Sequence, residues 1–369
     1  MREILTHDPP PLQTRIPTHE PPPLHSRRYR RMNLRPLLKR LTVRNVVIFR
    51  ALQLGDMLCA VPALRALRAA LPCAQITLVG LPWAQQFADR FSSYIDGFIA
   101  FPGHAALPEQ PVQRDQLIGF YQSMHAQEFS LALQMHGDGR VTNGIVKGFR
   151  ARANAGFAAS EATECDRLSY FPYPDRGAEP LRLLNLVSLL GAPPAGAQLE
   201  FPLLPADWDE LNGTGLAVGL VPGSYMCIHP GASVRDKCWP PARFAQVADQ
   251  LAFEFGLSTV ITGSGKEAEL AGEVAARMRS PAINAAAPIS IGAMAALMSG
   301  ARLLICNDTG VSHIAAGLRL KSVVVFSKAD IHRWAPLDRR MHRSVWDPNG
   351  DHADEVVKQA RLLLAGVPY

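Results

Sequence analysis

The sequence predicts an α/β fold built from two successive Rossmann-like domains, each a parallel sheet with helices on both faces, with a cleft between them. From residue 45 onward, short apolar runs alternate with segments of helical periodicity, which is typical of βαβ units. This alternation is interrupted at 191–224, a segment rich in Gly and Pro, and then restarts. The length of 369 residues agrees with two domains of roughly 100–200 residues each.

The first half is expected to begin with a buried strand and an amphipathic helix. The run VVIF at 46–49 is continuously apolar, as in a strand that is buried on both faces. Residues 56–71 follow, with Leu and Val recurring at helical spacing. Three further apolar runs predict strands at 76–79, 97–100 and 131–133, with helices between them.

The second half repeats this pattern after the segment that we interpret as a linker. Strands are expected at 226–229, 258–262, 302–306 and 322–326. Helices are expected at 241–255, 266–279, 290–299 and 310–318. We therefore place one domain at 45–205, a second at 206–350, and a C-terminal helix at 351–369 that packs back on the first domain.

Residues 1–44 are expected to form a disordered, basic, proline-rich tail. They hold eight prolines, and 10 Lys and Arg against 3 Asp and Glu. Proline lacks the backbone N–H and fixes φ, so the first part of this tail does not nucleate a helix or a central strand. Three interpretations stay open. The segment is an extended tether, a basic patch for a membrane surface, or the product of a gene start assigned too early, since Met32 offers a later initiator.

Composition excludes several classes of protein. The net charge of +6 comes from the tail, which carries +7, whereas the remainder carries −1, so we expect no nucleic-acid partner. The six cysteines form no CxxC pair, which argues against a zinc site and a disulfide framework. No stretch approaches the roughly 18–20 apolar residues that span a bilayer. The N-terminus lacks the apolar core of a secretory signal, so a cytoplasmic location is expected.

The first loop of interest joins the strand at 46–49 to the next helix. Ligands of doubly wound sheets bind beyond the carboxyl ends of the strands. This loop has no GxGxxG dinucleotide fingerprint, but it carries a single carboxylate, Asp56. That carboxylate is either a helix cap, worth about 1 kcal/mol, or a functional base, and position alone favours neither.

Three loops of the second half have residues suited to an anion. A turn of small residues precedes Ser233 and Lys237, which offer a hydroxyl and a cation to a phosphate; the alternative is a tight turn with a solvated lysine. Asp308, Thr309 and Gly310 begin a helix whose free N–H groups favour an anion, with Asp308 as a cap or a ligand-orienting carboxylate. The remaining candidates are Glu267, a ribose ligand or a first-turn helix residue, and His313, which by itself is more often structural than catalytic.

Together these segments resemble glycosyltransferase family 9, the heptosyltransferase-like family of lipopolysaccharide inner-core assembly. The resemblance rests on three groups of residues in the family order and spacing, and it covers about 45–365. They are GDML at 55–58 with PALR at 62–65, HPGAS at 229–233 with KCWP at 237–240, and NDTGVSHIAA at 307–316. After Phe326, where family members often have Gly-Pro, this chain has Ser327 and Lys328.

The resemblance implies a GT-B fold, with the acceptor bound mainly by the first domain and the nucleotide sugar mainly by the second. It implies an inverting transfer that needs no metal and no cofactor beyond the donor substrate. The general base would be Asp56, and the donor-site candidates would be Ser233, Lys237, Glu267, Asp308, Thr309, Gly310 and His313.

The implied donor is ADP-heptose, and the implied acceptor is a lipid-linked glycan, a lipopolysaccharide core, at the inner face of the inner membrane. Three alternatives stay open: transfer from another nucleotide sugar, a GT-B-like sugar-nucleotide epimerase, and an inactive homologue that acts as a scaffold. The presence of Asp56, Lys237 and Asp308 together argues against the last of these.

Overall fold

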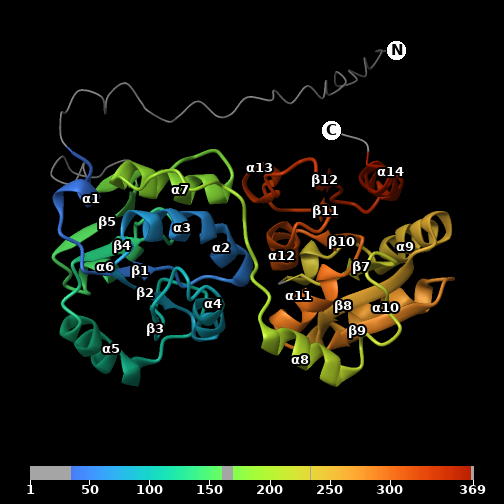
Figure 1. The fold of residues 1–369 in the computed structure, drawn as a ribbon, viewed down its shortest axis with the longest axis horizontal. Coiled ribbons are helices and arrows are strands. Elements are labelled where there is room, and N and C mark those ends of the chain that lie inside the picture. Colours follow the sequence, from blue (N-terminus) through green and yellow to red (C-terminus); the bar gives the residue numbers. More distant parts are fainter. Residues whose placement is uncertain (1–34, 160–168, 233, 367–369) are drawn as a thin grey trace, which may run out of the picture. The chain divides into compact units, whose positions relative to one another are not determined.

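The computed structural model describes residues 35–159, 169–232 and 234–366. In this part of the chain the strands form two six-stranded sheets (Figure 1). Every pairing between neighbouring strands of the described residues is parallel. Both sheets belong to one compact unit, Pro36–Tyr369. The predicted α/β class with two parallel sheets is confirmed.

The first sheet has the strand order β3-β2-β1-β4-β5-β6. Its central strand pairs with a neighbour on each side, so that Val47 lies opposite Thr77 and Ala132. A strand in this position is covered on both faces, which explains its continuous apolar run. The strands are β1 (Asn45–Phe49), β2 (Gln75–Gly80), β3 (Gly97–Ala100), β4 (Leu131–Gln134), β5 (Ala153–Ala158) and β6 (Tyr170–Pro172).

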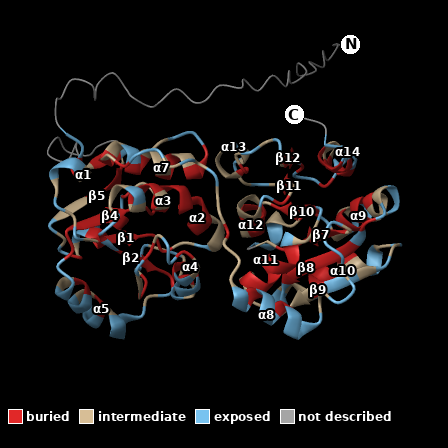
Figure 2. Cartoon of the chain, in the orientation of Figure 1, coloured by how far each residue is buried: buried red, intermediate tan, exposed pale blue. Residues whose placement is uncertain are grey.

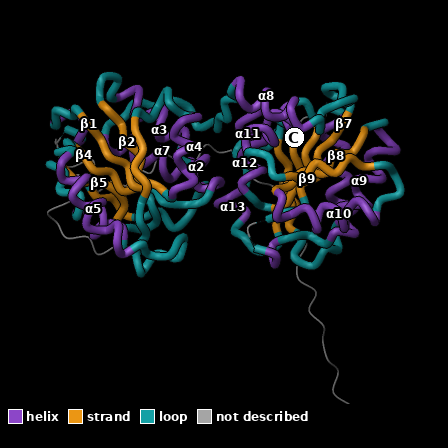
Figure 3. The backbone as a smooth tube through the Cα atoms, turned by 90° about the horizontal axis from the view of Figure 1, so that it is seen from below, coloured by secondary structure: helices purple, strands orange, loops and turns teal. Residues whose placement is uncertain are grey.

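Helices cover both faces of this sheet, as Figure 3 shows. Successive side chains of a strand point to opposite faces. Accordingly Val46 and Ile48 pack with residues of α2, α3, α4 and α7, whereas Val47 and Phe49 pack with residues of α5 and α6. The helices are α2 (Leu54–Cys59), α3 (Val61–Ala70), α4 (Gln85–Arg90), α5 (Arg114–Ala126), α6 (Thr142–Lys147) and α7 (Glu179–Leu190).

The second sheet repeats the arrangement with the order β12-β11-β10-β7-β8-β9. Two of its strands, at the two edges, were not predicted from the sequence. One of them, β9, is rich in alanine and partly exposed, so it lacks the apolar signal of a buried strand. The strands are β7 (Tyr225–His229), β8 (Ser258–Ser264), β9 (Ala282–Ala287), β10 (Leu303–Asn307), β11 (Ser322–Phe326) and β12 (His342–Trp346).

Both faces of the second sheet are also covered by helices, and its four inner strands are largely buried between them (Figure 2). Ile228 packs with residues of α9, α10 and α14, whereas Cys227 belongs to the same cluster as residues of α11 and α12. The helices are α8 (Pro205–Thr214), α9 (Pro241–Phe255), α10 (Ala268–Arg277), α11 (Ile291–Ser299), α12 (Gly310–Leu318), α13 (Ile331–Trp334) and α14 (Ala353–Leu364), with short 3-10 turns at η4 (Arg235–Lys237) and η5 (Gly265–Glu267).

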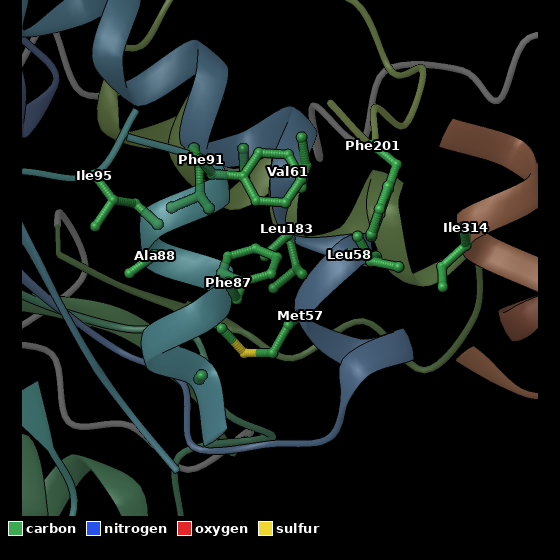
Figure 4. Close-up of a cluster of buried hydrophobic side chains, with 14 of the residues drawn as sticks. Met57, Leu58, Val61, Phe87, Ala88, Phe91, Ile95, Leu183, Phe201 and Ile314 are labelled. Carbon is green, nitrogen blue, oxygen red and sulfur yellow. The ribbon is translucent and has the colours of Figure 1, made fainter. Parts of the chain in front are cut away.

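One apolar cluster extends from the first sheet to the second. Leu58 of α2, Phe201 of the connecting segment and Ile314 of α12 all belong to it, and Figure 4 shows them side by side. Glycines allow α2 and α12 to approach closely, because a Cβ on Gly310 would lie 3.2 Å from the backbone nitrogen of Gly55. This contact brings the carboxyl-end loops of β1 and β10 together.

The C-terminal helix differs from its prediction. We expected it to pack back on the first domain, but α14 packs against α9, β11 and β12 of the second sheet. Its apolar face, which includes Val356, Val357 and Ala360, is buried in the cluster on that sheet. The prediction was wrong because amphipathicity shows that a helix has a buried face but not which surface covers that face.

Two other segments also differ in their local structure. The helix expected at 56–71 is divided into α2 and α3 at Ala60, and Pro62 lies in the first turn of α3, where proline is tolerated. The linker expected at 191–224 contains α8, which packs against α11. The domain boundaries at 205 and 350 stay a prediction.

The expected disordered tail lies mostly outside the described residues, which begin at residue 35. Its last part is ordered, contrary to the prediction, because α1 spans Leu37–Arg40 and Leu37 is 8% exposed within the apolar cluster. This segment contains leucines where the earlier part of the tail is rich in proline, and leucine favours both helix formation and apolar burial. None of the helices in the described ranges has the length and hydrophobicity required to cross a bilayer.

Candidate active site

A cavity of about 750 Å³ lies at the carboxyl ends of β1, β7, β8 and β10. This volume is within the usual range for small-molecule sites. Both halves of the chain contribute to its wall, with Asp56 from the first and Asp308 from the second. The predicted site residues that line it are Asp56, Lys237, Glu267, Asp308, Thr309, Gly310 and His313. Ser233 lies outside the described residues.

Asp56 is half-buried in the first turn of α2. It does not cap this helix, because the N-cap residue is Gln53 and no side chain caps the helix there. Among the described residues, no side chain donates a hydrogen bond to its carboxylate; instead, Arg50 donates from Nε and Nη2 to the backbone oxygen of Asp56, at 3.0 and 2.8 Å. Burial raises the pKa of Asp56, partly offset by the positive charge of Arg50. The carboxylate is therefore free to accept a proton.

Asp308 lies across the cavity in the loop between β10 and α12. Its Oδ2 is 3.7 Å from Nζ of Lys237. Burial raises the pKa of Asp308; Lys237 opposes this shift, and the negative charge of Asp56 adds to it. The charge of Asp56 thus acts on Asp308, and among the described residues Asp308 has a cation as a direct partner whereas Asp56 has none.

The start of α12 adds a second positive element beside this pair. Thr309 is its N-cap residue, in an extended conformation and without a side-chain capping bond. The first N–H groups of a helix have no partner within the helix, and its dipole favours an anion there. Because Thr309, Gly310 and Val311 line the cavity, a bound phosphate would meet both this helix terminus and Lys237.

Asn307, the last residue of β10, holds the loop that carries Lys237. It is fully buried; its Nδ2 donates to the carbonyl of Pro230 at 2.7 Å, and its Oδ1 accepts from the backbone N–H of Trp239 at 2.9 Å. Ser327 also donates to the backbone oxygen of Lys237, at 3.2 Å. Asn307 was not predicted from the sequence to be functional, although an amide at the end of an apolar strand, directly before Asp308, was the available signal.

Glu267 both caps a helix turn and lines the cavity. Its Oε2 accepts hydrogen bonds from the backbone N–H and the Oγ of Ser264, at 2.8 and 2.7 Å. A Cβ on Gly231 would overlap Oε1 of Glu267, so the small residue after Pro230 is required for this carboxylate to approach the loop. Glu267 thus completes a capping box with Ser264, and its remaining oxygen faces the loop and the buried His229, 4.0 Å away.

His313 lies on α12 and is 4% exposed. Both ring nitrogens are 3.9 Å from Sγ of Cys59 on α2, and the ring of Trp334 lies at 6.5 Å, edge to face. Burial lowers the pKa of His313 to about 4, so the imidazole is neutral near pH 7. These contacts are typical of a side chain that packs between α2 and α12, here at the wall of the cavity.

A charged network behind Asp56 was not foreseen from the sequence. Glu179, at the start of α7, is 3% exposed and lies between Arg50 of the first half and Arg333 of α13. Each of the three residues is more than a hundred positions from the other two, so no local motif indicates that they meet. In the described part of the chain, no group of three or more His, Cys, Asp or Glu is placed to hold a metal ion.

Comparisons with solved structures agree with this architecture. A glycosyltransferase family 9 structure from Veillonella parvula DSM 2008 matches with a TM-score of 0.74 and 20% identity, over 88% of this chain and 98% of that chain. The structure of E. coli ADP-heptose lps heptosyltransferase II matches with a TM-score of 0.66 and 18% identity, over 87% and 98%. At these identities the likeness shows the fold, which is the predicted GT-B arrangement.

Sequence comparisons give the family. Lipopolysaccharide heptosyltransferase 3 of Escherichia coli is 29% identical over 165 residues, which is 43% of this chain and 47% of that protein. The matched region thus spans about half the length of this relative. The profile of glycosyltransferase family 9 (heptosyltransferase) matches residues 120–364, which begins after Asp56 but includes every donor-site candidate. On this match to most of its length, the chain belongs to glycosyltransferase family 9.

Proposed function

We propose that the chain is an inverting, metal-independent glycosyltransferase that transfers heptose from ADP-heptose to a lipopolysaccharide core or a related surface glycan. The observation that carries this proposal is that the two halves of the chain line one cavity with different chemical groups. The first half offers a carboxylate with no side-chain partner among the described residues, Asp56, and the second offers Lys237, Asp308 and the start of α12.

The chemistry assigned to these groups is a single displacement. A hydroxyl of the acceptor attacks the anomeric carbon of the donor, and the bond from that carbon to the nucleoside diphosphate breaks. Asp56 takes the proton of the hydroxyl as general base. Lys237 and the N-terminus of α12 neutralise the charge that grows on the leaving diphosphate. Attack from the face opposite the leaving group inverts the anomeric centre.

The choice of donor and acceptor is supported by the family and by its named relatives. One solved neighbour is titled an ADP-heptose heptosyltransferase, and the curated relative is named for lipopolysaccharide. Glu267 is suited to the ribose diol of a nucleotide, because a carboxylate accepts hydrogen bonds from both hydroxyls. A lipid-linked acceptor would be met at the inner face of the membrane, where basic residues such as Arg27 and Arg28 would attract anionic headgroups.

Thermal denaturation of the purified full-length chain with ADP, UDP, GDP or CMP tests the donor. A ligand at a hundred times its dissociation constant stabilises the folded state by about 2.7 kcal/mol. We expect ADP to raise the melting temperature most. A larger rise with another nucleotide would mean that the donor carries that nucleotide and is not ADP-heptose. No rise with any nucleotide would contradict the assignment of the cavity as a nucleotide-sugar site.

Turnover then distinguishes transfer from its alternatives. With ADP-heptose and a lipopolysaccharide-core acceptor, we expect release of ADP only when the acceptor is present. Conversion of the donor without acceptor would indicate an epimerase instead. Nucleotide binding without any turnover would indicate an inactive scaffold.

A further inference from the structure

The side chain of Glu179 is enclosed by two arginines from opposite halves of the chain. Nη2 of Arg50 is 3.3 Å from Oε1, and Nε and Nη2 of Arg333 are 3.0 and 2.9 Å from Oε2. Each carboxylate oxygen therefore has its own guanidinium. The side chains of Arg50 and Glu179 are 1% and 4% exposed, whereas that of Arg333 is 30% exposed.

This network reaches the site from both sides. The Arg50 guanidinium that contacts Glu179 also donates two hydrogen bonds to the backbone oxygen of Asp56. On the other side, the guanidinium of Arg333 lies 4.7 Å from the ring centroid of Trp334, which lines the cavity, and it donates to the hydroxyl of Tyr173 at 2.7 Å. Glu179 is thus the link between the turn that holds Asp56 and the α13 wall of the cavity.

Removal of this link would change both geometry and charge. A guanidinium makes several directional hydrogen bonds at once, so an arginine held by a carboxylate presents its remaining N–H groups in a defined direction. Without Glu179, Arg50 and Arg333 would be two cations in a largely buried region with no shared counter-ion. Two positive charges with no negative one between them would repel each other and change the field at Asp56.

We propose that Glu179 is a positioning residue for Asp56: it fixes Arg50 against the Asp56 turn and ties that turn to Arg333 on the α13 wall. The proposal rests on the proposed function, in which Asp56 is the general base. Glu179 itself makes no contact with the reacting atoms in this role; it acts through the two arginines.

The charged and titratable groups that face Asp56 come from four places in the fold. They are Arg50 after β1, Glu179 on α7, Arg333 on α13 and Asp308 before α12. Two other titratable neighbours, Cys59 and His313, stay neutral near pH 7, because burial raises the pKa of the thiol and lowers that of the imidazole to about 4.

The network predicts opposite effects from its two ends. Neutralising Glu179 leaves more positive charge beside Asp56, which favours the carboxylate and lowers its pKa. Neutralising Arg333 removes positive charge and raises that pKa. Because a general base acts when deprotonated, the acid limb of the kcat/KM profile should move to lower pH in Glu179→Gln and to higher pH in Arg333→Gln.

The test uses the full-length chain with donor and acceptor, and compares these two variants with wild type from low to neutral pH. We expect shifts of about one pH unit in opposite directions, a loss of roughly tenfold in kcat for Glu179→Gln, and a donor KM within about threefold of wild type. Glu200→Gln is the matched control, because Glu200 also pairs with a partly buried arginine, Arg65, but does not line the cavity. It should leave the acid limb in place.

Shifts in the same direction, or no shift, would overturn the proposal and leave Glu179 as a structural ion pair. If Glu179→Gln does not fold by melting temperature, Arg333→Gln still decides, since its acid limb must move to higher pH. Asp56→Asn separates the two levels of inference. If Asp56→Asn keeps normal turnover, Asp56 is not the general base and that part of the proposed function fails, and the role of Glu179 fails with it. If Asp56→Asn loses turnover while the acid limbs of the other two variants do not move, only the role of Glu179 fails.

Discussion

Asp56 and Asp308 line the same cavity from the two halves of the chain, yet their surroundings differ. Asp56 lies in the first turn of α2, after β1, and Asp308 directly follows β10, before the start of α12. Burial raises the pKa of both. Asp308 has Nζ of Lys237 at 3.7 Å, whereas Arg50 donates hydrogen bonds to the backbone oxygen of Asp56 and not to its carboxylate.

The difference shows how neighbouring charged groups give two similar carboxylates different chemical roles. A carboxylate beside a lysine holds that cation in place, and the cation can then meet a phosphate. A half-buried carboxylate without such a partner holds its proton more readily, which suits a general base. The roles that we propose for Asp56 and Asp308 therefore follow from their neighbours rather than from their positions in the turns. Two experiments test this contrast directly, and two further experiments test the other roles that we propose.

The largest effect is expected for Asp56→Asn. Asparagine keeps the size of the side chain but cannot take a proton, so kcat should fall by roughly 10²–10⁴. The dissociation constant of ADP and the melting temperature should stay near wild type, because Asp56 neither caps α2 nor pairs with the donor-site lysine. Initial rates, calorimetry with ADP and thermal melting on one preparation provide the test.

Two outcomes for Asp56→Asn would contradict the contrast. Near-normal turnover would mean that the base lies elsewhere. A loss of ADP affinity would place Asp56 in the donor site and remove the division of labour between the two halves.

Lys237→Ala should follow, with a loss of roughly 10²–10³ in kcat/KM for the donor, because charge on the leaving diphosphate is no longer neutralised. ADP affinity should fall as well, which distinguishes this variant from Asp56→Asn. Lys358→Ala is the matched control, since Lys358 lies on α14, pairs with Glu355 and does not line the cavity. A value within threefold of wild type for Lys237→Ala would show that this lysine is merely solvated.

Glu267→Gln should have a smaller effect that separates capping from ligand binding. Glutamine can replace glutamate in the capping box with Ser264, so the melting temperature should change little. Loss of the charged acceptor for the ribose should raise the donor KM by roughly tenfold or more, since hydrogen bonds to charged groups contribute about 1.5–3 kcal/mol. An unchanged KM together with a normal melting temperature would leave Glu267 with a capping role alone.

The smallest effect on catalysis is expected from a chain that starts at Met32. It keeps α1 and both sheets, so turnover on a soluble acceptor should change little. Binding to anionic vesicles should weaken by about 1 kcal/mol for each basic residue lost near the surface. Failure of this shortened chain to fold would contradict the assignment, and unchanged vesicle binding would exclude a membrane role for the tail.

Local patterns were sufficient for much of the fold. The run at 46–49 predicted β1, and the helical periodicity at 310–318 predicted α12 with its observed bounds. Such predictions work because burial on both faces requires a continuous apolar run, and burial on one face of a helix requires a repeat near 3.6 residues. The alanine-rich β9 has no continuous apolar run, so it was not predicted. The apolar repeat at 56–71 continues across Ala60, so it did not show that the helix is divided there.

For the site, the sequence by itself determined which loops carry chemistry, because carboxyl-end loops of parallel strands are identifiable once the strands are known. Asp56, Lys237, Glu267 and Asp308 were all found in this way, and all four line one cavity. Only the tertiary structure decided which of them are paired, that Asn307 holds the Lys237 loop, and that Glu179 joins Arg50 to Arg333. Such contacts join residues far apart in the chain, and the free energy of a buried charge depends on all its neighbours in space, which no local sequence pattern contains.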